Sequence, residues 1–364
     1  MGAPPRIKSQ KGKTHATGVL ARAANELRRG RTIAIAGDDG KTMLAMAVET
    51  ASDRAIVKLG KAAILLLTHA RARTLKIRLY TPGVVALKPP VLSADVLRAI
   101  ADPTADLATP LKGPFAALRA PLPDAAAASV KLAKLAGLLP AVLSKPVARA
   151  PKGVYRISAR DIRDYESQSV ATLAVVTRAR VPLEGAEHTE LVAFRAADGG
   201  PENYAIVIGA PRRDRPVLAR LHSECFTGDL LGSLKCDCGP QLRGAIAAIA
   251  KAGGGVLLYL AQEGRGIGLI NKLRAYRLQD QGFDTLEANE RLGFEADERL
   301  YGVAARMLKL LGFKAVKLMT NNPDKVAGLE AEGIAVAKRV PHKFGENAHN
   351  RLYLATKAKA GHLL

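Results

Sequence analysis

The chain has no tryptophan, few other aromatic residues and little cysteine. Of its 364 residues, 4% are aromatic and only three are cysteines, whereas 48% are hydrophobic. The hydrophobic cores therefore have to be built mainly from alanine, leucine, valine and isoleucine. An odd number of cysteines without a secretory signal argues against a disulfide-stabilised extracellular fold. The scarcity of aromatic side chains also leaves few surfaces on which unpaired bases of a nucleic acid could stack.

Long apolar runs and targeting signals are absent as well. No segment approaches the roughly 18–20 consecutive apolar residues that a membrane-spanning helix needs. Residues 1–15 are polar and basic, and no apolar segment follows them as a secretory signal requires. Arg6 stands where an N-myristoylation motif has serine or threonine. We therefore expect a soluble cytoplasmic protein that does not bind membranes.

Acidic residues are outnumbered by basic ones. The chain contains 55 Lys and Arg against 33 Asp and Glu, a formal net charge of +22. Such a charge favours polyanionic partners, although a solvated basic surface is the simpler interpretation. No segment resembles a module that reads RNA or DNA. A nucleoside triphosphate meets the same electrostatic demand, so we expect a small anionic substrate and no nucleic acid partner.

The length of the chain predicts two domains. Segments of helical and strand periodicity alternate from about Leu20 onward, which predicts two α/β domains. Residues 1–17 are expected to form a disordered basic tail, residues 18–150 the first domain and residues 151–364 the second. Helices are expected at Leu20–Arg29, Ala127–Leu138, Gln241–Lys251, Ile267–Gln281, Glu298–Leu311 and after Pro323, and strands at Thr32–Ala36, Met43–Val48, Ala62–Leu67, Leu191–Arg195, Tyr204–Ile208, Val256–Leu260 and Ala315–Met319.

The three cysteines lie close together, at Cys225, Cys236 and Cys238. Three thiolates can bind Zn²⁺ and leave the fourth tetrahedral position to water, which is the arrangement of a catalytic site. His222 is a possible fourth ligand that would close the site and make it structural. Three buried cysteines without a metal are the remaining interpretation. The cysteines alone do not decide between catalytic and structural zinc.

Three polar segments next to apolar ones suggest anion binding. The glycine-rich segment Gln262–Gly268 follows a predicted strand and opens a predicted helix, where backbone N–H groups can approach an anion. Met319–Lys325 repeats the design, with Pro323 at the start of a helix. Asp297-Glu-Arg299 precedes an apolar helix. Each segment also has a simpler interpretation: a turn with a Glu263–Arg265 surface ion pair for the first, and a helix cap for the other two.

The run from Arg220 to Leu364 closely resembles the GTP cyclohydrolase II family. The matching segments are RLHSECFTGDLLGSLKCDCGPQL, LAQEGRGIGLINKLRAYRLQDQGFDTLEAN, LGFEADERLYG, LMTNNPDKVAGLEAEGI and YLATKAKAGHLL. The resemblance implies a mixed sheet with flanking helices and a zinc site in a homodimeric, Mg²⁺-assisted enzyme. Its implied reaction converts GTP to formate, pyrophosphate and 2,5-diamino-6-(5-phospho-ribosylamino)pyrimidin-4(3H)-one, the first step of riboflavin biosynthesis.

The resemblance also implies roles for individual residues. Cys225, Cys236 and Cys238 fall on the ligands of one zinc ion per subunit. Asp297 falls on a proton acceptor, Arg299 on a nucleophile toward the α-phosphate and Tyr276 on a tyrosine near the purine. The positions that contact GTP in the family are Arg220, Leu221, His222, Ser223, Glu224, Gln241, Glu263, Gly264, Arg265, Thr285, Thr320 and Lys325.

The implied chemistry fits these residue types, with one exception. Zinc-activated water can attack C8 of the guanine, and cationic groups such as Arg265 and Lys325, together with Mg²⁺, can clamp the triphosphate. An arginine nucleophile is unusual, because the guanidinium stays protonated below a pKa of about 12. Assistance from Asp297 or a purely electrostatic role for Arg299 would remove that difficulty.

Two positions depart from the family pattern. Leu300 replaces an aspartate that often follows the arginine, and Ala261 replaces a basic residue that often precedes Gln-Glu-Gly-Arg. They leave room for a related enzyme that acts on another nucleotide. A different alternative is a zinc- and nucleotide-binding scaffold without catalysis. Such a scaffold would have no chemical need for the complete set Cys225, Cys236, Cys238, Tyr276, Asp297 and Arg299.

The first domain weakly resembles 3,4-dihydroxy-2-butanone 4-phosphate synthase, in the segments ANELRRGRTIAIAGDDG and SVKLAKLAGLLPAVLSK. That enzyme needs an acidic loop for Mg²⁺, and a histidine and a glutamate for proton transfer. Here Asp38-Asp39-Gly40-Lys41 lacks the acidic run. Pro123–Ala128 stands in place of the Gly-His-Thr-Glu element, and Ser144-Lys145 in place of the later glutamate. A site poor in carboxylates can neither hold the metal nor move the protons. We expect a domain that keeps the scaffold without the chemistry.

Overall fold

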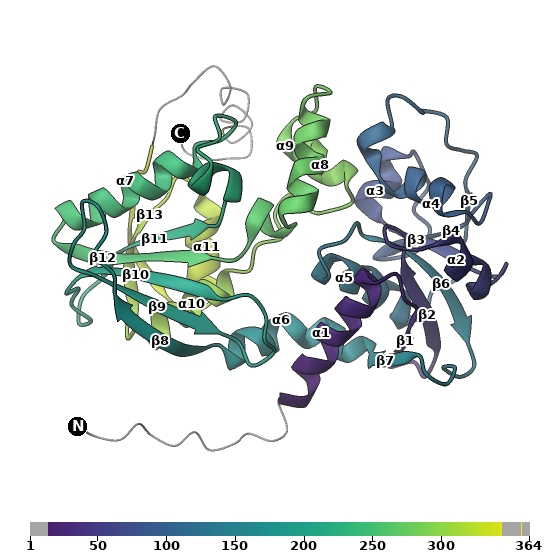
Figure 1. Ribbon diagram of the computed structural model, residues 1–364, viewed down its shortest axis with the longest axis horizontal. Helices are drawn as coiled ribbons and strands as arrows, with labels where there is room; N and C mark the ends of the chain where they lie inside the picture. Colours follow the sequence, from purple (N-terminus) through teal and green to yellow (C-terminus); the bar gives the residue numbers. More distant parts are fainter. Residues whose placement is uncertain (1–13, 344–357, 359–364) are drawn as a thin grey trace.

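Two seven-stranded sheets organise the chain in the computed structural model, which describes residues 14–343 and residue 358. Helices pack on each sheet, so the expected pair of α/β domains is confirmed (Figure 1). No described helix is long and apolar enough to span a membrane. The last segment of the family resemblance, residues 353–364, lies outside the described residues except for residue 358.

The first sheet has the strand order β5-β4-β3-β6-β2-β1-β7. All neighbours are antiparallel except β1 and β7. The strands are β1 (Ile33–Ala36), β2 (Thr42–Ala47), β3 (Ile64–Thr68), β4 (Val84–Lys88), β5 (Ala116–Ala117), β6 (Ala141–Val147) and β7 (Tyr155–Ser158). The helices are α1 (Thr14–Arg28), α2 (Asp53–Leu59), α3 (His69–Thr74), α4 (Ala94–Ala101), the 3-10 turn η1 (Pro103–Ala105), α5 (Asp124–Leu135) and α6 (Ala159–Thr172). Apolar side chains of α1 and α5 pack on one face of the sheet, and those of α2 and α4 on the other.

The second sheet has the order β14-β13-β11-β12-β10-β9-β8. It is mixed, as expected, because β12, β11, β13 and β14 are parallel neighbours and the other pairs are antiparallel. The strands are β8 (Ala174–Arg180), β9 (Thr189–Arg195), β10 (Asn203–Gly209), β11 (Val217–Ser223), β12 (Gly254–Leu260), β13 (Ala315–Met319) and β14 (Ala335–Val340). The helical segments are η2 (Phe226–Leu230), α7 (Cys238–Lys251), η3 (Glu263–Gly266), α8 (Leu269–Gln279), α9 (Thr285–Arg291), α10 (Tyr301–Leu310) and α11 (Pro323–Ala331). α7 covers one face, and α10 and α11 cover the other.

Helices α8 and α9 lie between the two domains (Figure 1). They follow β12 of the second sheet, yet their buried side chains join a hydrophobic cluster of the first domain. The cluster contains Ala275, Leu278, Ala288 and Leu292 together with residues of β3, β4 and α4. Each of these four side chains is less than 5% exposed. The α8–α9 pair is therefore packed on the first domain, whereas its chain connections belong to the second.

Most of the strands and helices expected from sequence are present, with ends that differ by a few residues. The expected tail falls largely outside the described residues, but its last residues, from Thr14, belong to α1. The first sheet includes β7, so it extends past the boundary expected at residues 150/151. β11 was not predicted, because Arg220 and His222 interrupt its apolar pattern although both are buried.

Candidate active site

A cavity lies at the carboxyl ends of three neighbouring parallel strands, β11, β12 and β13. The loops that follow these strands begin at Glu224, Ala261 and Thr320. In open α/β sheets, ligands commonly bind at this edge. Helices α8 and α9 close the opposite side, with Tyr276 and Thr285 in the cavity wall. Of the fifteen predicted substrate-binding and catalytic residues, all except Leu221 and Asp297 line this cavity, as do the three cysteines.

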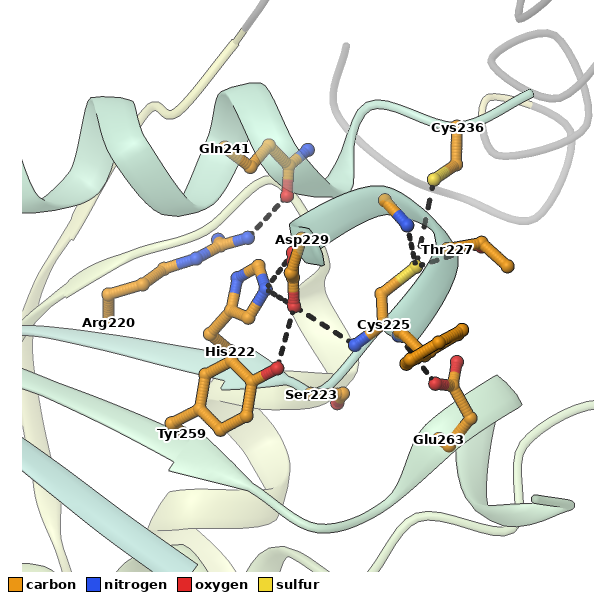
Figure 2. Close-up of polar contacts among 12 residues, drawn as sticks. Arg220, His222, Ser223, Cys225, Thr227, Asp229, Cys236, Gln241, Tyr259 and Glu263 are labelled. Atoms are coloured by element: carbon orange, nitrogen blue, oxygen red, sulfur yellow. Dashed lines mark hydrogen bonds and ion pairs between the residues drawn. The ribbon is translucent and has the colours of Figure 1, made fainter. Parts of the chain in front are cut away.

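The three cysteines meet at one end of the cavity. Cys225 follows β11, and Cys238 is the first residue of α7. The Sγ atoms all lie within 4.8 Å of one another, and those of Cys225 and Cys236 are 3.7 Å apart (Figure 2). Two thiolates bound to one tetrahedral zinc at about 2.3 Å would be separated by about 3.8 Å. Among the described residues, this is the one group of three or more Cys, His, Asp or Glu side chains placed to hold a metal ion.

Gly228 in η2 is required by this close approach. A Cβ atom at this position would lie 2.8 Å from the Sγ of Cys236 and 3.0 Å from the Sγ of Cys225. The Gly228 N–H donates to the Sγ of Cys225 at 3.3 Å. The absence of a side chain therefore leaves room for three thiolates and for a backbone donor to one of them.

Lys272 of α8 contacts the cysteine cluster directly. Its Nζ lies 2.9 Å from the Sγ of Cys225 and 2.7 Å from Oε1 of Glu263. Hydrogen bonds from Cys236 and Cys238, and then from Lys272, lower the pKa of the Cys225 thiol. Burial alone would lower the pKa of Lys272, but its bonds to Cys225 and Glu263 outweigh burial and raise it. The alternative interpretation of Glu263 and Arg265 as a surface ion pair is therefore wrong, because Glu263 is buried and paired with Lys272.

His222 is turned away from the cysteines. Its Nε2 lies 3.0 Å from both carboxylate oxygens of Asp229, and Oδ2 of Asp229 also accepts hydrogen bonds from the Cys225 N–H and the Tyr259 hydroxyl (Figure 2). Burial lowers the pKa of His222, which keeps the ring neutral with its proton directed to Asp229. Since Asp229 ties the Cys225 loop to β11 and β12, His222 supports the cluster indirectly and is not its fourth ligand.

Two further buried cations of the second domain line the cavity, Arg220 of β11 and Lys325 of α11. Arg220 is 5% exposed and donates to the carbonyl of Met319 at 2.9 Å and to Gln241 at 2.5 Å. Burial lowers its pKa to about 10, so it remains charged at neutral pH. Lys325 is also buried and donates to the carbonyl of Leu221 at 2.7 Å. Leu221 contributes this carbonyl, whereas its side chain is buried in the core.

Asp297 holds the side chain of Arg299. Its carboxylate accepts from the Arg299 backbone N–H at 3.0 Å, from Nε at 2.8 Å and from Nη2 at 2.5 Å. Burial opposes ionisation of Asp297, but Arg299 outweighs it and lowers the pKa of the carboxyl. The interpretation of Asp297 as a helix cap is wrong, because α10 begins at Tyr301 and no side chain caps it. Asp297 instead orients a guanidinium that lines the cavity.

The loop after β12 contacts the Asp297–Arg299 segment. Gly264 and Arg265 both adopt left-handed backbone conformations. At Gly266, a Cβ atom would lie 2.7 Å from the carbonyl oxygen of Glu298, so the close approach requires glycine. The Arg265 carbonyl accepts from the Glu298 N–H at 3.0 Å. The glycine-rich loop therefore fixes the Asp297–Arg299 segment beside it. The second polar segment behaves as a cap, because the Asn322 side chain accepts from the Asp324 N–H.

Tyr276 and Thr285 enter the cavity from α8 and α9. The Tyr276 hydroxyl lies 3.4 Å from Oγ1 of Thr227, and burial raises its pKa. Thr285 accepts a hydrogen bond from Gln279 at 3.1 Å. Lys272 and Tyr276 are four residues apart, so they share one face of α8.

Several residues that line the cavity were not predicted from the sequence, and two positions that depart from the family pattern do not line it. The missed residues are Ile267, Lys272, Ala275, Gln279, Asn289, Asn321, Asn322 and His342. Only Lys272 and Gln279 carried a usable signal, one helical turn before Tyr276 and three residues after it. Neither Ala261 nor Leu300 lines the cavity; both border a second cavity between the domains. The two departures from the family pattern therefore leave the described cavity wall intact.

We predict an acid-dependent loss of stability from His342. Burial lowers its pKa to about 4, from 6.5 in the unfolded chain. Between these values only the unfolded state binds the proton. The contribution of neutral His342 to the free energy of unfolding is therefore fully present above pH 6.5 and is lost as the pH falls toward 4. The total loss is at most about 3 kcal/mol. Urea unfolding at several pH values measures it. His342→Gln, which can still donate to the carbonyl of Gln241, should show a shallower decline than the wild type. Equal slopes would contradict the assignment.

Comparisons with known proteins give similarities for both parts of the chain. The model of the family described as GTP cyclohydrolase II matches residues 174–341. Over 357 residues the chain is 52% identical to a GTP cyclohydrolase-2 of Azospirillum brasilense, which covers 94% of this chain and 93% of the relative. It is 63% identical over 166 residues to a GTP cyclohydrolase-2 of Azotobacter vinelandii, covering 45% of this chain and 80% of that protein.

Two further similarities concern proteins with different names. The riboflavin biosynthesis protein RibBA of Bacillus velezensis is 59% identical over 167 residues, which are 45% of this chain and 42% of that protein. Among solved structures, RibBX, a two-domain 3,4-dihydroxy-2-butanone 4-phosphate synthase from A. baumannii, aligns with 88% of this chain and 99% of its own. The identity is 17% and the TM-score is 0.34.

Proposed function

Since the chain belongs to the GTP cyclohydrolase II family, we propose that it hydrolyses GTP to 2,5-diamino-6-(5-phospho-ribosylamino)pyrimidin-4(3H)-one, formate and pyrophosphate, the first step of riboflavin biosynthesis. One observation carries the proposal: three cysteine side chains with metal-binding spacing line a cavity whose other walls hold buried cations. A closed structural zinc site would not need such a cavity.

The cysteines supply the metal site in this proposal. Cys225, Cys236 and Cys238 would hold one Zn²⁺, and a glycine at position 228 leaves space for their sulfur atoms. When bound, zinc supplies Lewis-acid activation of water for attack on C8 of guanine and on the resulting formamide. Nδ1 of His222 is buried and has no hydrogen-bond partner among the described residues, which leaves it as an acceptor for a substrate N–H.

The triphosphate would be bound by cations of the second domain. Arg220, Arg265, Arg299 and Lys325 line the cavity and come from four separate segments. Mg²⁺ that enters with GTP would neutralise further phosphate charge. Each turnover uses three waters: one opens the ring at C8, one releases formate and one separates pyrophosphate from the remaining phosphate.

Arg299 acts electrostatically in this account. Asp297 accepts from its Nε and Nη2 with two oxygens, which keeps the guanidinium charged and oriented. A charged, fixed guanidinium can stabilise negative charge that develops on the α-phosphate as pyrophosphate leaves. It cannot also offer a lone pair to phosphorus, so a covalent role would require loss of a proton that the ion pair retains.

We further propose a cytoplasmic homodimer without a nucleic acid partner. Exposed apolar side chains of η2 and the loop after it support self-association, since such patches commonly mark interfaces. They are Phe226, Leu230, Leu231 and Leu234, which are 46%, 71%, 64% and 59% exposed. Sedimentation of the purified chain checks this: a single species of twice the chain mass is expected, and a monomer at all concentrations would contradict it.

Substrate choice tests the proposed function. The zinc-loaded chain is incubated with Mg²⁺ and either GTP or ATP, and formate is measured. Formate from GTP and none from ATP is the expected result. Faster formate release from another nucleotide would favour the divergent-enzyme alternative, and no reaction with any nucleotide would favour a non-catalytic scaffold.

For the first domain we propose a scaffold without its own reaction. The acidic loop that should hold Mg²⁺ is engaged otherwise: Asp38 is paired with Arg163 and lies near Arg160, and Asp39 accepts from the Lys41 N–H. The Azospirillum brasilense relative, which matches nearly the whole chain, bears the name GTP cyclohydrolase-2 alone.

The chain should therefore form no dihydroxybutanone phosphate from ribulose 5-phosphate. The physical reason is that a carboxylate held by arginines is not free for metal binding or proton transfer. Incubation with ribulose 5-phosphate and Mg²⁺, followed by detection of the four-carbon product, makes the measurement. Steady product formation would show that the first domain retains catalysis.

A further inference from the structure

Helix α8 presents different side chains to the two domains. Lys272, Tyr276 and Gln279 line the cavity of the second domain. Asn271, Arg274 and Leu278 face the first domain, where Leu278 is fully buried in the hydrophobic cluster. The main packing neighbours of α8 are α9 and η3, which are close to it along the chain, and η1, which belongs to the first domain. The position of the two cavity side chains Lys272 and Tyr276 therefore depends on how the first domain holds α8.

Glu49 is the main polar anchor of α8 in the first domain. Its Oε1 accepts from Nη2 of Arg274 at 3.0 Å, and its Oε2 accepts from Nη1 at 3.3 Å. Oε2 also accepts from the Leu139 N–H at 2.8 Å, which fixes the carboxylate within its own domain. Only 17% of the Glu49 side chain and 20% of the Arg274 side chain are exposed. A bidentate pair shielded to this degree restricts the orientation of the helix more than a surface ion pair does.

Other polar contacts of Arg274 and Asn271 also connect α8 to the first domain. Nη1 of Arg274 also donates to Oδ1 of Asn271 at 2.7 Å, and Asn271 donates to the carbonyl of Gly137 at 3.2 Å. Nε of Arg274 lies 3.3 Å from Oδ2 of Asp102. Every N–H-bearing atom of the Arg274 guanidinium thus has a partner, and those outside α8 belong to the first domain.

Lys134 of α5 makes a second connection. Its Nζ lies 2.6 Å from Oε1 of Glu298, the residue between Asp297 and Arg299. Glu298 also donates its backbone N–H to the Arg265 carbonyl. The described residues of the first domain line no part of the cavity in the second domain, but they contact two parts of the cavity wall. Glu49 binds α8, and Lys134 binds the Asp297–Arg299 segment.

We propose that Glu49 and Lys134 are positioning residues of the GTP site, through which the first domain fixes Lys272 and Tyr276 on one side and Arg299 on the other. The inference rests on the proposed function. It gives the first domain a role that requires none of the carboxylates of a catalytic site. A displacement of about 1 Å at catalytic side chains can lower turnover by about a hundredfold. Anchors outside the cavity can therefore control the rate without contacting GTP.

The first test replaces Glu49 in the full-length chain. Glu49→Gln should lower kcat/KM for GTP by about tenfold, since Arg274 loses its bidentate charged partner, keeps only the single carboxylate contact with Asp102, and α8 shifts. Arg274→Gln should cause a similar loss, and the double variant should be no worse than either one, because both act through one pair. Glu166→Gln is the matched control: it removes a half-buried interhelical ion pair with Lys131 that contacts neither α8 nor the Asp297–Arg299 segment. It should retain wild-type turnover.

A spectroscopic readout separates positioning from loss of folded protein. Co²⁺ replaces zinc, and the sulfur-to-cobalt charge-transfer band is recorded without GTP. Lys272 donates to the Sγ of Cys225 from α8. A shifted α8 weakens this hydrogen bond, so in Glu49→Gln the band should move to longer wavelength. Partial unfolding would reduce its intensity at an unchanged position. Lys134→Met should lower turnover about tenfold and leave the band in place, because it acts on Arg299.

These outcomes distinguish the two proposals. Wild-type turnover and an unmoved band in Glu49→Gln would overturn the positioning role while leaving the GTP reaction standing. Additive losses in the Glu49→Gln, Arg274→Gln double variant would overturn it as well. Absence of GTP turnover in the wild-type chain, with the band still shifted in Glu49→Gln, would contradict the proposed reaction and retain the positioning of α8.

Discussion

Replacing Cys236 by serine should abolish formate release from GTP and leave GTP binding measurable. A serine hydroxyl stays protonated at neutral pH and cannot replace a thiolate as a zinc ligand. Arg220 and Lys325, which we propose to bind the triphosphate, lie on other segments and keep their own hydrogen bonds to backbone carbonyls. Loss of the metal therefore removes the hydrolysis while most of the attraction for the triphosphate remains.

Four measurements on Cys236→Ser check this expectation. Bound zinc per chain should fall well below one, formate should fall below detection, and the Kd for GTP measured by calorimetry should change by only a few fold. The far-ultraviolet circular dichroism spectrum should match that of the wild type. Formate release at the wild-type rate would show that the cysteine cluster is not the hydrolytic site.

Replacing Arg299 by lysine should lower kcat by about 10²- to 10³-fold, the cost of removing a fixed transition-state donor. A lysine keeps the charge but cannot donate two parallel hydrogen bonds to the Asp297 carboxylate, as the planar guanidinium of Arg299 does. Asp297→Asn should lower kcat by about 10²-fold, because an amide offers one acceptor oxygen and no charge to orient the guanidinium. Since Asp297 does not line the cavity, its substitution should change KM less than kcat.

The matched control for this pair is Glu295→Gln. Glu295 is an exposed carboxylate on the same segment and lines no part of the site cavity. Steady-state kinetics with GTP should show wild-type kcat for this control. Full activity of Asp297→Asn would mean that the orientation of Arg299 does not limit turnover. Comparable losses in Glu295→Gln would assign the effect to the segment as a whole.

The cysteine cluster could be predicted from sequence because its three members lie close together along the chain. Cys225, Cys236 and Cys238 occupy one short stretch, and a turn brings such neighbours into contact. The flanking loops were recognisable for a similar reason, since glycine and proline mark the ends of strands and the starts of helices. Ion-pair partners were harder to predict from the sequence. Glu263 pairs with Lys272 in α8 and not with Arg265, which is two residues away.

Residues that reach the site through sheet order could not be predicted. His342 follows β14, and it enters the cavity because β14 lies beside β13 and β13 beside β11. Nothing in the local sequence specifies that order. The strand β11 was missed for a related reason: its buried Arg220 and His222 resemble surface residues until their partners Gln241 and Asp229 are known.

The packing of α8 on the first domain could not be predicted from the sequence either. The apolar residues of α8 predict a helix, but they do not specify that its buried face packs on the first domain. The contact between Glu49 and Arg274 joins residues 225 positions apart. Only the folded chain shows that a domain expected to serve as a scaffold supports the wall of a site in the other half.

The stoichiometry of products from GTP tests the central claim most directly. The zinc-loaded full-length chain is incubated with GTP and Mg²⁺, and formate, pyrophosphate and consumed GTP are measured in the same samples over time. A zinc-free preparation serves as the control. Equal amounts of formate and pyrophosphate are expected for each GTP consumed, and no formate is expected without zinc. Pyrophosphate without formate, or consumption of GTP that does not depend on zinc, would contradict the proposed reaction.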